Sequence, residues 1–405
     1  MTPTIITGDA ARASDARVIG LVSAAHFVSH IYILVLPPLF PFVRTDFGVS
    51  YTELGIAIAI FNILTGLLQT PAGFLVDRFS ARAVLIGGLL LGAAALAAAS
   101  LVSSFYIFVA MFALLGVANA TYHPADYSLL SGRVSPPRMG QAYSIHIFAG
   151  FAGTAAAPAT LLILAGSLGW RGAFLAAAAL GVVVAAALLL FGDVMAGRDP
   201  ARIKEKETGE KGADSRILLS APILLSLCFY MLLAMAGGLQ IYGIVALEAL
   251  WGTSLSLATT AITAYLAMSA FAVLVGGYVS ARTDRHDLVA VTGLALNALT
   301  LLPVAFFDLG AAALIGLLGL SGFCNGVLQP SRDMIVRAVT PPGAFGRVFG
   351  FVTTGFNIGG VIAPPVFGYL MDNGEPRLVI LGVALCALVS IPTVMITVAQ
   401  RAKKT

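Results

Sequence analysis

The sequence predicts an all-α integral membrane protein whose twelve transmembrane helices form two pseudo-symmetric six-helix bundles. Of its 405 residues, 59% are hydrophobic and only 10% are charged, whereas soluble domains carry about 25% charged residues. Twelve apolar stretches reach the length of about 20 residues that crosses a bilayer. Backbone groups in lipid must pair within their own segment, so these stretches are helices rather than open strands.

The twelve stretches are joined by polar connections. We expect helices over residues 18–43, 52–75, 83–103, 105–131, 140–165, 171–192, 217–248, 255–280, 288–307, 310–336, 346–370 and 377–400. The longest connection carries six basic and six acidic side chains and separates six helices from six. The predicted domains are therefore a cytoplasmic tail (1–17), an N-terminal bundle (18–192), a cytoplasmic linker (193–216), a C-terminal bundle (217–400) and a cytoplasmic tail (401–405).

A repeat relates the two halves. A shift of 206 positions places Asn119, Pro124, Gly153 and Pro158 on Asn325, Pro330, Gly359 and Pro364. Asn and Pro are scarce inside apolar helices, so these matches are informative. Two parallel repeats are typical of a secondary transporter with its site between the halves. The prolines also fit kinks in gating helices, where neighbouring helices satisfy the freed carbonyls.

The basic residues predict the orientation. All but three of the 23 Lys and Arg residues fall on one side, and the exceptions are Arg44, Arg171 and Arg377. The positive-inside rule then places both termini in the cytoplasm, and we expect a multi-pass protein of a prokaryotic plasma (inner) membrane. The net charge of +4 reflects this topology. No basic patch interleaved with aromatic residues indicates nucleic acid as a partner.

The loop between the second and third helices carries a recognisable motif. It runs Gly73-Phe-Leu-Val-Asp77-Arg78-Phe-Ser-Ala-Arg82 and resembles Gly-x3-Asp-Arg-x3-Arg, the signature loop of the major facilitator superfamily. The resemblance implies the major facilitator fold. Gly73 would allow close helix contact, and Asp77 would pair with basic groups or a helix N-terminus of the other half and hold the cytoplasmic side shut. Ala281 replaces this aspartate in the second copy, which predicts a weaker latch there.

Finer features resemble the branch typified by fosmidomycin-resistance transporters. They are His26-Phe-x2-His30-x-Tyr32, Gln69-x-Pro71-x-Gly73 and Tyr122-His123-Pro124. That branch often has an acidic residue where this chain has His30. Gly153-x3-Ala157-Pro158 is similar to the antiporter motif Gly-x3-Gly-Pro, which favours export. Phe112 stands near the position where proton-driven members often carry Arg, so one usual coupling element is absent.

Polar and ionisable residues within membrane helices are costly and indicate function. The candidates for substrate binding or proton coupling are His26, His30, Tyr32, Tyr122, His123, His146, Gln240, Tyr242, Asn325, Gln329 and Asn357. In one hypothesis the histidines titrate near neutral pH and carry protons, or they bind an anionic head group. In the other, each histidine bonds a neighbouring helix. Helices 1, 4, 7 and 10 line the cavity in the resembled family, which favours His30, Gln240 and Gln329.

A second set of residues is predicted to take part in gating. It comprises Gly73, Asp77, Arg78, Arg82, Asp126, Arg332, Asp333, Gly153, Pro158, Gly359 and Pro364. Asp126 and Arg332 lie near the predicted cytoplasmic boundary, and we interpret them as gate or structural charges paired locally with Arg133 or Asp333. The repeat matches Asp126 with Arg332, so the alternative is a pair across the seam between the halves.

Enzyme motifs are missing from the sequence. It has no His-Glu-x2-His, no Walker A motif and no Gly-x-Ser-x-Gly, and the spacing of Cys228, Cys324 and Cys386 supports neither a disulfide nor a metal site. We expect no cofactor. The predicted function is secondary active transport of a small organic anion or amphipathic compound by alternating access, as a monomer, with export coupled to protons. The alternatives are proton-coupled uptake of a carboxylate or similar metabolite, and a transport-dead membrane sensor or assembly partner.

Overall fold

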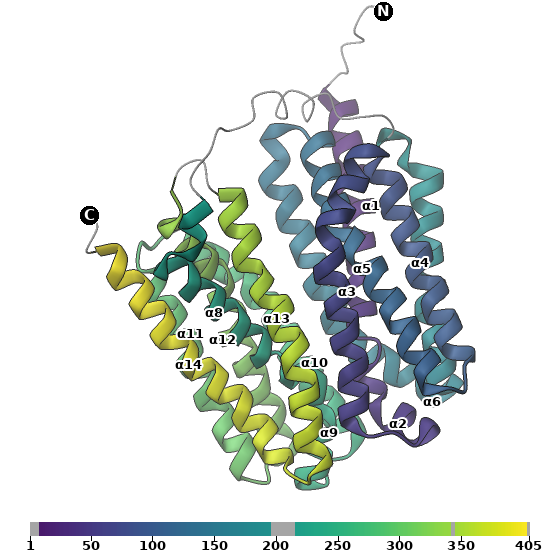
Figure 1. Ribbon diagram of the computed structural model, residues 1–405, viewed down its shortest axis with the longest axis vertical. Helices are drawn as coiled ribbons and strands as arrows, with labels where there is room; N and C mark the ends of the chain where they lie inside the picture. Colours follow the sequence, from purple (N-terminus) through teal and green to yellow (C-terminus); the bar gives the residue numbers. More distant parts are fainter. Residues whose placement is uncertain (1–7, 196–214, 342–344, 403–405) are drawn as a thin grey trace, which may run out of the picture. The chain divides into compact units, whose positions relative to one another are not determined.

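Helices make up all the regular secondary structure described by the computed structural model, which covers residues 8–195, 215–341 and 345–402. Side chains are described for residues 12–195, 217–341 and 348–400. Most of these helices are long (Figure 1), and eleven helical stretches in this part of the chain are long and apolar enough to cross a membrane. The predicted all-α membrane fold is confirmed.

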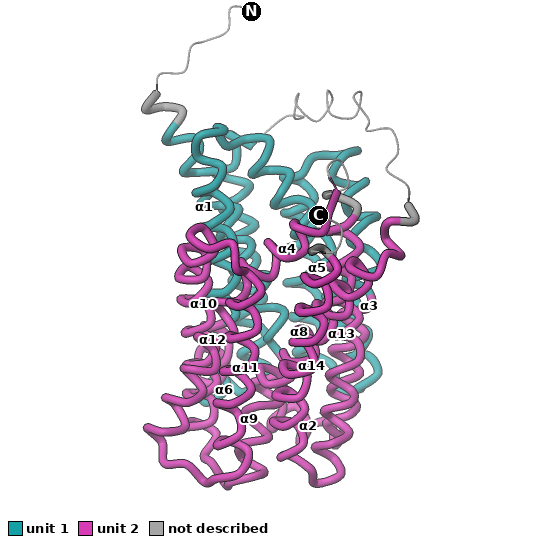
Figure 2. The backbone as a smooth tube through the Cα atoms, turned by 90° about the vertical axis from the view of Figure 1, so that its left-hand side faces the viewer, with its two compact units in different colours: residues 1–35, 64–154, 164–209 teal, residues 36–63, 155–163, 210–405 magenta. Residues whose placement is uncertain are grey.

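The first compact unit contains the described residues of 1–35, 64–154 and 164–209, drawn in teal in Figure 2. Its elements are α1 (Gly8–Ile33), the second half of α3 (Tyr51–Arg78), α4 (Ala81–Leu101), α5 (Phe105–Arg133), η2 (Pro136–Arg138), most of α6 (Met139–Phe191) and η3 (Gly192–Met195). Helix α5 contacts both α1 and α4, so α5 lies at the centre of this unit.

Helix α6 contains two membrane crossings. Its 53 residues would extend about 80 Å as one straight helix, far beyond the roughly 30 Å of a bilayer core. Gly169 interrupts it with φ 70° and ψ 167°, a conformation that favours glycine. The parts on either side match the predicted helices over 140–165 and 171–192. The eleven stretches therefore contain the twelve predicted crossings.

The second unit contains the described residues of 36–63, 155–163 and 210–405, drawn in magenta in Figure 2. Its elements are η1 (Pro37–Leu39), α2 (Phe40–Phe47), the first half of α3, η4 (Ser215–Leu219), α8 (Ala221–Ala236), α9 (Gly238–Trp251), α10 (Leu255–Ser280), α11 (His286–Phe306), α12 (Ala311–Val339), α13 (Phe345–Asp372) and α14 (Pro376–Ala402). Within it, α8 packs against α13 and α14, and α10 packs against α12. The single helix predicted over 217–248 is broken at Gly237.

The start of α3 is tied to α13 inside the second unit. One oxygen of Asp372 accepts a hydrogen bond from the backbone N–H of Tyr51 at 2.8 Å. Its other oxygen accepts bonds from the N–H of Thr52 at 2.8 Å and from the Thr52 hydroxyl at 2.5 Å. A carboxylate at a helix N-terminus satisfies free N–H groups and complements the helix dipole. Asp372 is thus the cap of α3.

A second bond joins the same two helices farther along. Pro364 has no N–H, so the carbonyl of Gly360, four residues earlier, lacks its usual helical donor. Asn62 Nδ2 donates to that oxygen at 3.0 Å. A side chain of α3 therefore satisfies the carbonyl that Pro364 frees. This agrees with the interpretation of Pro364 as a kink whose freed carbonyl is satisfied by a neighbouring helix.

The compact units differ from the two bundles that the sequence predicts on either side of residues 193–216, because the second unit also contains residues 36–63 and 155–163. Residues 36–63 group with the C-terminal half of the chain because of contacts such as those of Asp372 and Asn62. Most of the predicted linker lies outside the described residues. The repeat-based bundles therefore stay a prediction.

We predict that Asp372→Asn lowers the stability of the protein. The substitution removes the charge and one of the acceptor oxygens at the start of α3, which should cost about 1–2 kcal/mol. Thermal unfolding in detergent measures the change, and Asp308→Asn, at an exposed position between α11 and α12, serves as the control. An unchanged unfolding temperature in Asp372→Asn would contradict the capping role.

Glycines set the distance between α10 and α12. A Cβ atom on Gly322 would lie 1.9 Å from the carbonyl oxygen of Tyr265, whereas nothing lies within 4 Å of a Cβ on Gly316 in the same helix. We predict that Gly322→Ala destabilises the protein by about 1–3 kcal/mol. Gly316→Ala should be neutral or slightly stabilising because alanine favours helix. If the two variants unfold at the same temperature, the close contact at Gly322 does not contribute to stability.

Candidate functional site

Four of the chain's five histidines come together inside the first unit, from three helices. His26 and His30 lie on α1, His123 on α5 and His146 on α6. The His26 ring stacks on that of His146, with centroids 3.9 Å apart. The centroids of His30 and His123 lie 4.6 and 5.3 Å from that of His26. We call these four side chains, together with Asp126, the histidine cluster.

Asp126 lies beside His26 and His146 and is completely buried. Its Oδ2 atom is 3.4 Å from His26 Nδ1 and 3.9 Å from His146 Nε2. The sequence interpretation paired Asp126 locally with Arg133, whereas the structure places its carboxylate beside His26 and His146. Residues three apart share a helix face, so Asp126 points the same way as His123, toward α1 and α6.

Many polar atoms of the cluster have no hydrogen-bond partner among the described residues. They are His26 Nδ1, His123 Nδ1, both ring nitrogens of His146 and both carboxylate oxygens of Asp126. Buried polar groups in folded proteins are nearly always paired, and each exception needs an explanation. An isolated buried carboxylate is especially costly. The arrangement therefore marks a site that attracts a cation.

Glycines on α6 let this helix pack closely on α1 and leave room for the histidine rings. A Cβ atom on Gly150 would lie 2.6 Å from His26 Nε2 and 2.8 Å from His30 Nε2. Gly153 belongs to the motif that is similar to the antiporter motif. A Cβ atom on Gly153 would lie 2.3 Å from the Phe27 carbonyl oxygen. Both positions thus require glycine because of their neighbours on α1.

His30 is held by a side chain of α6. His30 Nδ1 lies 2.7 Å from the hydroxyl of Thr154, which donates to the carbonyl of Gly150 at 3.1 Å. The Thr154 hydroxyl has one proton, and the direction of its bond with His30 Nδ1 depends on the tautomer of the ring. This bond orients His30 beside His26.

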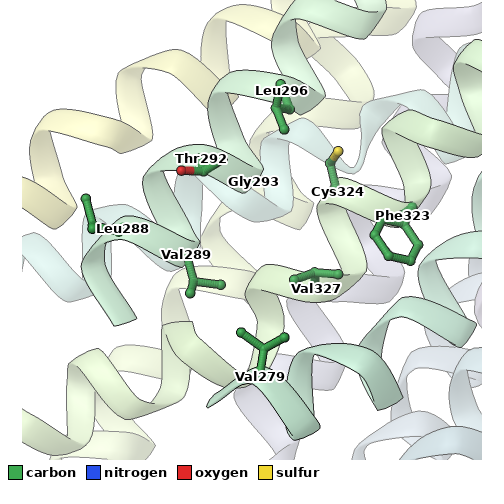
Figure 3. Close-up of a pocket in the computed structure, with 9 residues that line it drawn as sticks. All are labelled: Val279, Leu288, Val289, Thr292, Gly293, Leu296, Phe323, Cys324 and Val327. Carbon is green, nitrogen blue, oxygen red and sulfur yellow. The ribbon is translucent and has the colours of Figure 1, made fainter. Parts of the chain in front are cut away.

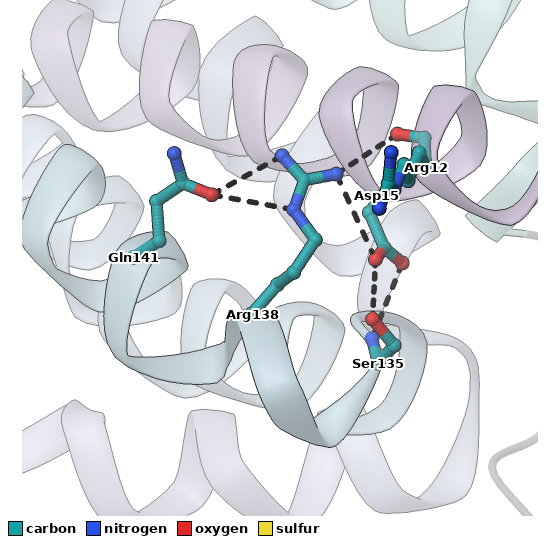
Figure 4. Close-up of polar contacts among 5 residues, drawn as sticks. All are labelled: Arg12, Asp15, Ser135, Arg138 and Gln141. Carbon is teal, nitrogen blue, oxygen red and sulfur yellow. Dashed lines mark hydrogen bonds and ion pairs between the residues drawn. The ribbon is translucent and has the colours of Figure 1, made fainter. Parts of the chain in front are cut away.

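A polar cluster near the start of α1 holds the same three helices together (Figure 4). The carboxylate of Asp15 accepts hydrogen bonds from the N–H and the hydroxyl of Ser135, at 3.2 and 2.5 Å. Arg138 donates to the carbonyl of Arg12 at 2.9 Å and to Gln141 at 3.2 Å. These bonds fix α1 against the connection between α5 and α6.

The two predicted tyrosines of the first unit are part of its core. Tyr32 and Tyr122 are almost completely buried, and a Cβ atom on Gly92 of α4 would lie about 3 Å from both rings. Tyr122 donates to the carbonyl of Gly88 at 3.2 Å. They pack α4 against α1 and α5.

The second unit holds an arginine that is largely but not completely buried. The guanidinium of Arg332 on α12 lies 4.7 Å from the ring centroid of Tyr230 and 5.1 Å from that of Phe356. It donates to Asp333 at 2.8 Å and also to Gln329. Tyr230 in turn donates to Asp333 at 2.5 Å. Cation–π contacts and charge-assisted bonds together fix the arginine.

The other predicted residues of the second unit lie apart from this arginine. Asn325 donates to Ser269 Oγ at 3.2 Å, which joins α12 to α10. Tyr242 on α9 donates to the carbonyl of Pro364 at 2.7 Å. Gln240 and Asn357 are partly buried. A Cβ atom on Gly359 would lie 2.4 Å from the carbonyl oxygen of Met231, so this glycine lets α13 approach α8.

The residues of the signature loop have separate surroundings. Arg82 donates to the carbonyls of Leu188 and Leu189 at 2.9 and 2.8 Å and so caps the end of α6. Asp77 and Arg78 are exposed. Pro158 lies in the second half of the first crossing of α6. A gating role for these residues and for Gly73 stays a prediction.

An apolar pocket of about 340 Å³ lies between α10, α11 and α12 (Figure 3). Its lining consists of Val279, Leu288, Val289, Thr292, Gly293, Leu296, Phe323, Cys324 and Val327. Thr292 is the only hydrogen-bonding side chain among them apart from the weakly polar thiol. The pocket offers no charged group to a polar substrate.

The sequence analysis missed the aromatic partners of Arg332 and the convergence of the histidines. Tyr230 and Phe356 are ordinary residues of apolar helices, and no local pattern distinguishes them. The usable local signals for the cluster were the spacings His26-x3-His30 and His123-x2-Asp126, each of which puts its two side chains on one helix face.

A multi-pass helical fold with ionisable side chains buried inside it is typical of membrane transporters. The chain belongs to the Major Facilitator Superfamily, whose family model matches residues 22–248 and 228–405. It is a secondary transporter and not an enzyme.

Relatives of known name extend over most of the chain. It is 24% identical over 390 residues to the fosmidomycin resistance protein of Escherichia coli, with 93% of each chain covered. It is 25% identical over 391 residues to the probable sulfoacetate transporter SauU of Cupriavidus necator, with 88% of this chain and 87% of the relative covered.

Solved structures show the same fold. A bacterial homologue of the human lysosomal transporter Spinster, in an inward-facing and occupied conformation, matches with a TM-score of 0.74 at 15% identity, over 95% of this chain and 96% of that chain. A mutant form of the nucleoside transporter NupG matches with a TM-score of 0.75 at 14% identity, over 95% of this chain and 99% of that chain.

We predict that Gly150→Ala disturbs the histidine cluster. The new methyl group would overlap His26 and His30 and push α6 away from α1, at a cost of about 1–3 kcal/mol. Thermal unfolding in detergent measures the effect. Gly140→Ala, on the same helix with no atom within 4 Å of the new Cβ, is the matched control. If both variants unfold at the same temperature, the cluster does not depend on this contact.

Proposed function

We propose that the protein exports a small organic anion or amphipathic compound in exchange for protons, and that Arg332 recognises the anionic group of the substrate. The observation that carries this proposal is the unequal burial of an ion pair within the second unit. The side chain of Arg332 is 13% exposed, whereas that of its partner Asp333 is 49% exposed. The carboxylate is thus the accessible member of the pair.

The surroundings of Arg332 suit an exchange of partners. Tyr230 and Phe356 hold the guanidinium in place through their rings. A guanidinium can bind a carboxylate or phosphate group through two parallel hydrogen bonds. A substrate anion would take the place of Asp333 on Arg332, while Tyr230 would keep its bond to Asp333. The buried arginine would then never lack a negative partner, which limits the cost of its burial.

Export and proton coupling are supported by the sequence. It has no nucleotide-binding motif, so transport against a gradient must draw on an ion or substrate gradient, and we propose the proton as the coupling ion. The motif ending in Ala157-Pro158 favours export. A relative named a fosmidomycin resistance protein and another named a probable sulfoacetate transporter support a small organic compound as the substrate.

We also propose that the protein works as a monomer in the plasma membrane of a prokaryote, with both termini in the cytoplasm. The distribution of its Lys and Arg residues supports this orientation. The bacterial source of its relatives supports the choice of membrane.

The test is a flux measurement in proteoliposomes that contain a pH-sensitive dye, with pooled organic anions and drugs as substrates. We predict substrate-triggered proton movement in the wild type. Arg332→Gln should lower kcat/KM for an anionic substrate about 30-fold or more, because it removes the charge-assisted hydrogen bonds of the guanidinium to the substrate, which we expect to be worth about 2 kcal/mol. Arg285→Gln, which removes an arginine whose side chain is 65% exposed, should leave transport unchanged.

The other outcomes are equally informative. Anion transport that is unchanged in Arg332→Gln would reject the recognition role. Substrate flux without proton movement would leave a facilitator or another coupling ion. Accumulation inside vesicles of known orientation would establish the direction as uptake or export. If the protein is correctly folded but transports none of the pooled compounds, the result would favour the hypothesis of a membrane sensor or assembly partner.

A further inference from the structure

We propose that His26, His123, His146 and Asp126 form a binding site for a divalent transition-metal ion of the Zn²⁺ type. The three histidines each offer one ligand atom, and these atoms all lie within 4.8 Å of one another. Asp126 Oδ2 lies 3.4 Å from His26 Nδ1 and 3.9 Å from His146 Nε2. The proposal does not depend on the substrate, the direction or the coupling ion of transport.

The donor set matches this class of metal. Zn²⁺ binds imidazole nitrogen and carboxylate oxygen in tetrahedral sites, and imidazole also suits Cu, Ni and Fe. Ca²⁺ and Mg²⁺ instead take mostly oxygen ligands, six or more in number. Three imidazoles and one carboxylate therefore select a transition metal. One negative charge would offset half of the charge of the ion.

The spacing is close to that of a tetrahedral site. Metal–ligand bonds of 2.0–2.1 Å place tetrahedral ligand atoms about 3.3 Å apart. The two distances from Asp126 are 3.4 and 3.9 Å, so this side of the site is already near its bound geometry. The histidine nitrogens, within 4.8 Å of one another, would close by rotation of the rings about χ2, a torsion with broad energy wells.

The proposal also accounts for most of the unpaired atoms. Four histidine nitrogens and both Asp126 oxygens are buried without a hydrogen-bond partner among the described residues. A bound ion would take a lone pair from one atom of each of its four ligands, and so from up to four of these six atoms. His30 lies beside His26 and is itself held by Thr154, so it supports the His26 ring from outside the ligand set.

The test uses Co²⁺ as a probe, because four-coordinate Co²⁺ has a distinct visible spectrum. Purified full-length protein in detergent, with an affinity tag that lacks histidine and with the three cysteines replaced by alanine, is titrated with Co²⁺. We expect one ion per chain, a tetrahedral spectrum and displacement by Zn²⁺. His146→Gln and Asp126→Asn should each weaken binding by more than about 100-fold, since even partners of the ligands contribute 10–100-fold.

His286→Gln is the matched control, because His286 on α11 is the one histidine outside the cluster. It should bind Co²⁺ like the parent protein, and size-exclusion chromatography checks that each variant is folded. The proposal is overturned if the parent protein shows no stoichiometric binding, or shows only the weak spectrum of six-coordinate Co²⁺. It is equally overturned if His146→Gln and Asp126→Asn, once shown to be folded, bind as tightly as His286→Gln. Binding is measured without transport, so failure of the proposed export would leave this result intact.

Discussion

The close approach of helix backbones at glycine is the constraint on which the rest of the structure depends. Lipid chains are as apolar as leucine, so helices in a membrane associate through tight packing rather than through expulsion of water. At Gly153, Gly322 and Gly359 the position of a Cβ atom falls within 2.4 Å of a carbonyl oxygen on the facing helix. The polar sites follow from these contacts, because they bring side chains of separate helices within reach of one another.

The two polar clusters differ in how completely their groups are paired. Around Arg332, every charged group has a partner of opposite charge or a hydrogen bond, so this network is stable as it stands. Around Asp126, the carboxylate and the imidazoles approach one another without bonding. The first cluster can recognise a ligand only by exchanging a partner, whereas the second gains partners when a cation enters.

Most of the fold could be predicted from the sequence, and little of the candidate site could. Length and hydropathy determine membrane crossings one segment at a time, and the break at Gly169 agrees with the predicted gap between two of them. The histidine cluster depends instead on which helices are neighbours: His26 and His146 are 120 positions apart, and no local pattern links them. Asp126 was placed near a membrane boundary by its distance from the end of its helix, but its partners are determined by α1 and α6.

The bond between Asn62 and the carbonyl freed by Pro364 has a consequence for how this protein can change over generations. The proline leaves the Gly360 carbonyl without its helical donor, and Asn62 donates a hydrogen bond to it, so loss of the asparagine would leave this oxygen unsatisfied. The repeat does not supply a second such pair, since the shift of 206 positions that relates Pro158 to Pro364 places Met268 opposite Asn62. The two halves follow one pattern, yet this bond joins Asn62 of the first half of the sequence to the carbonyl freed by Pro364 in the second half, so the two residues should change together.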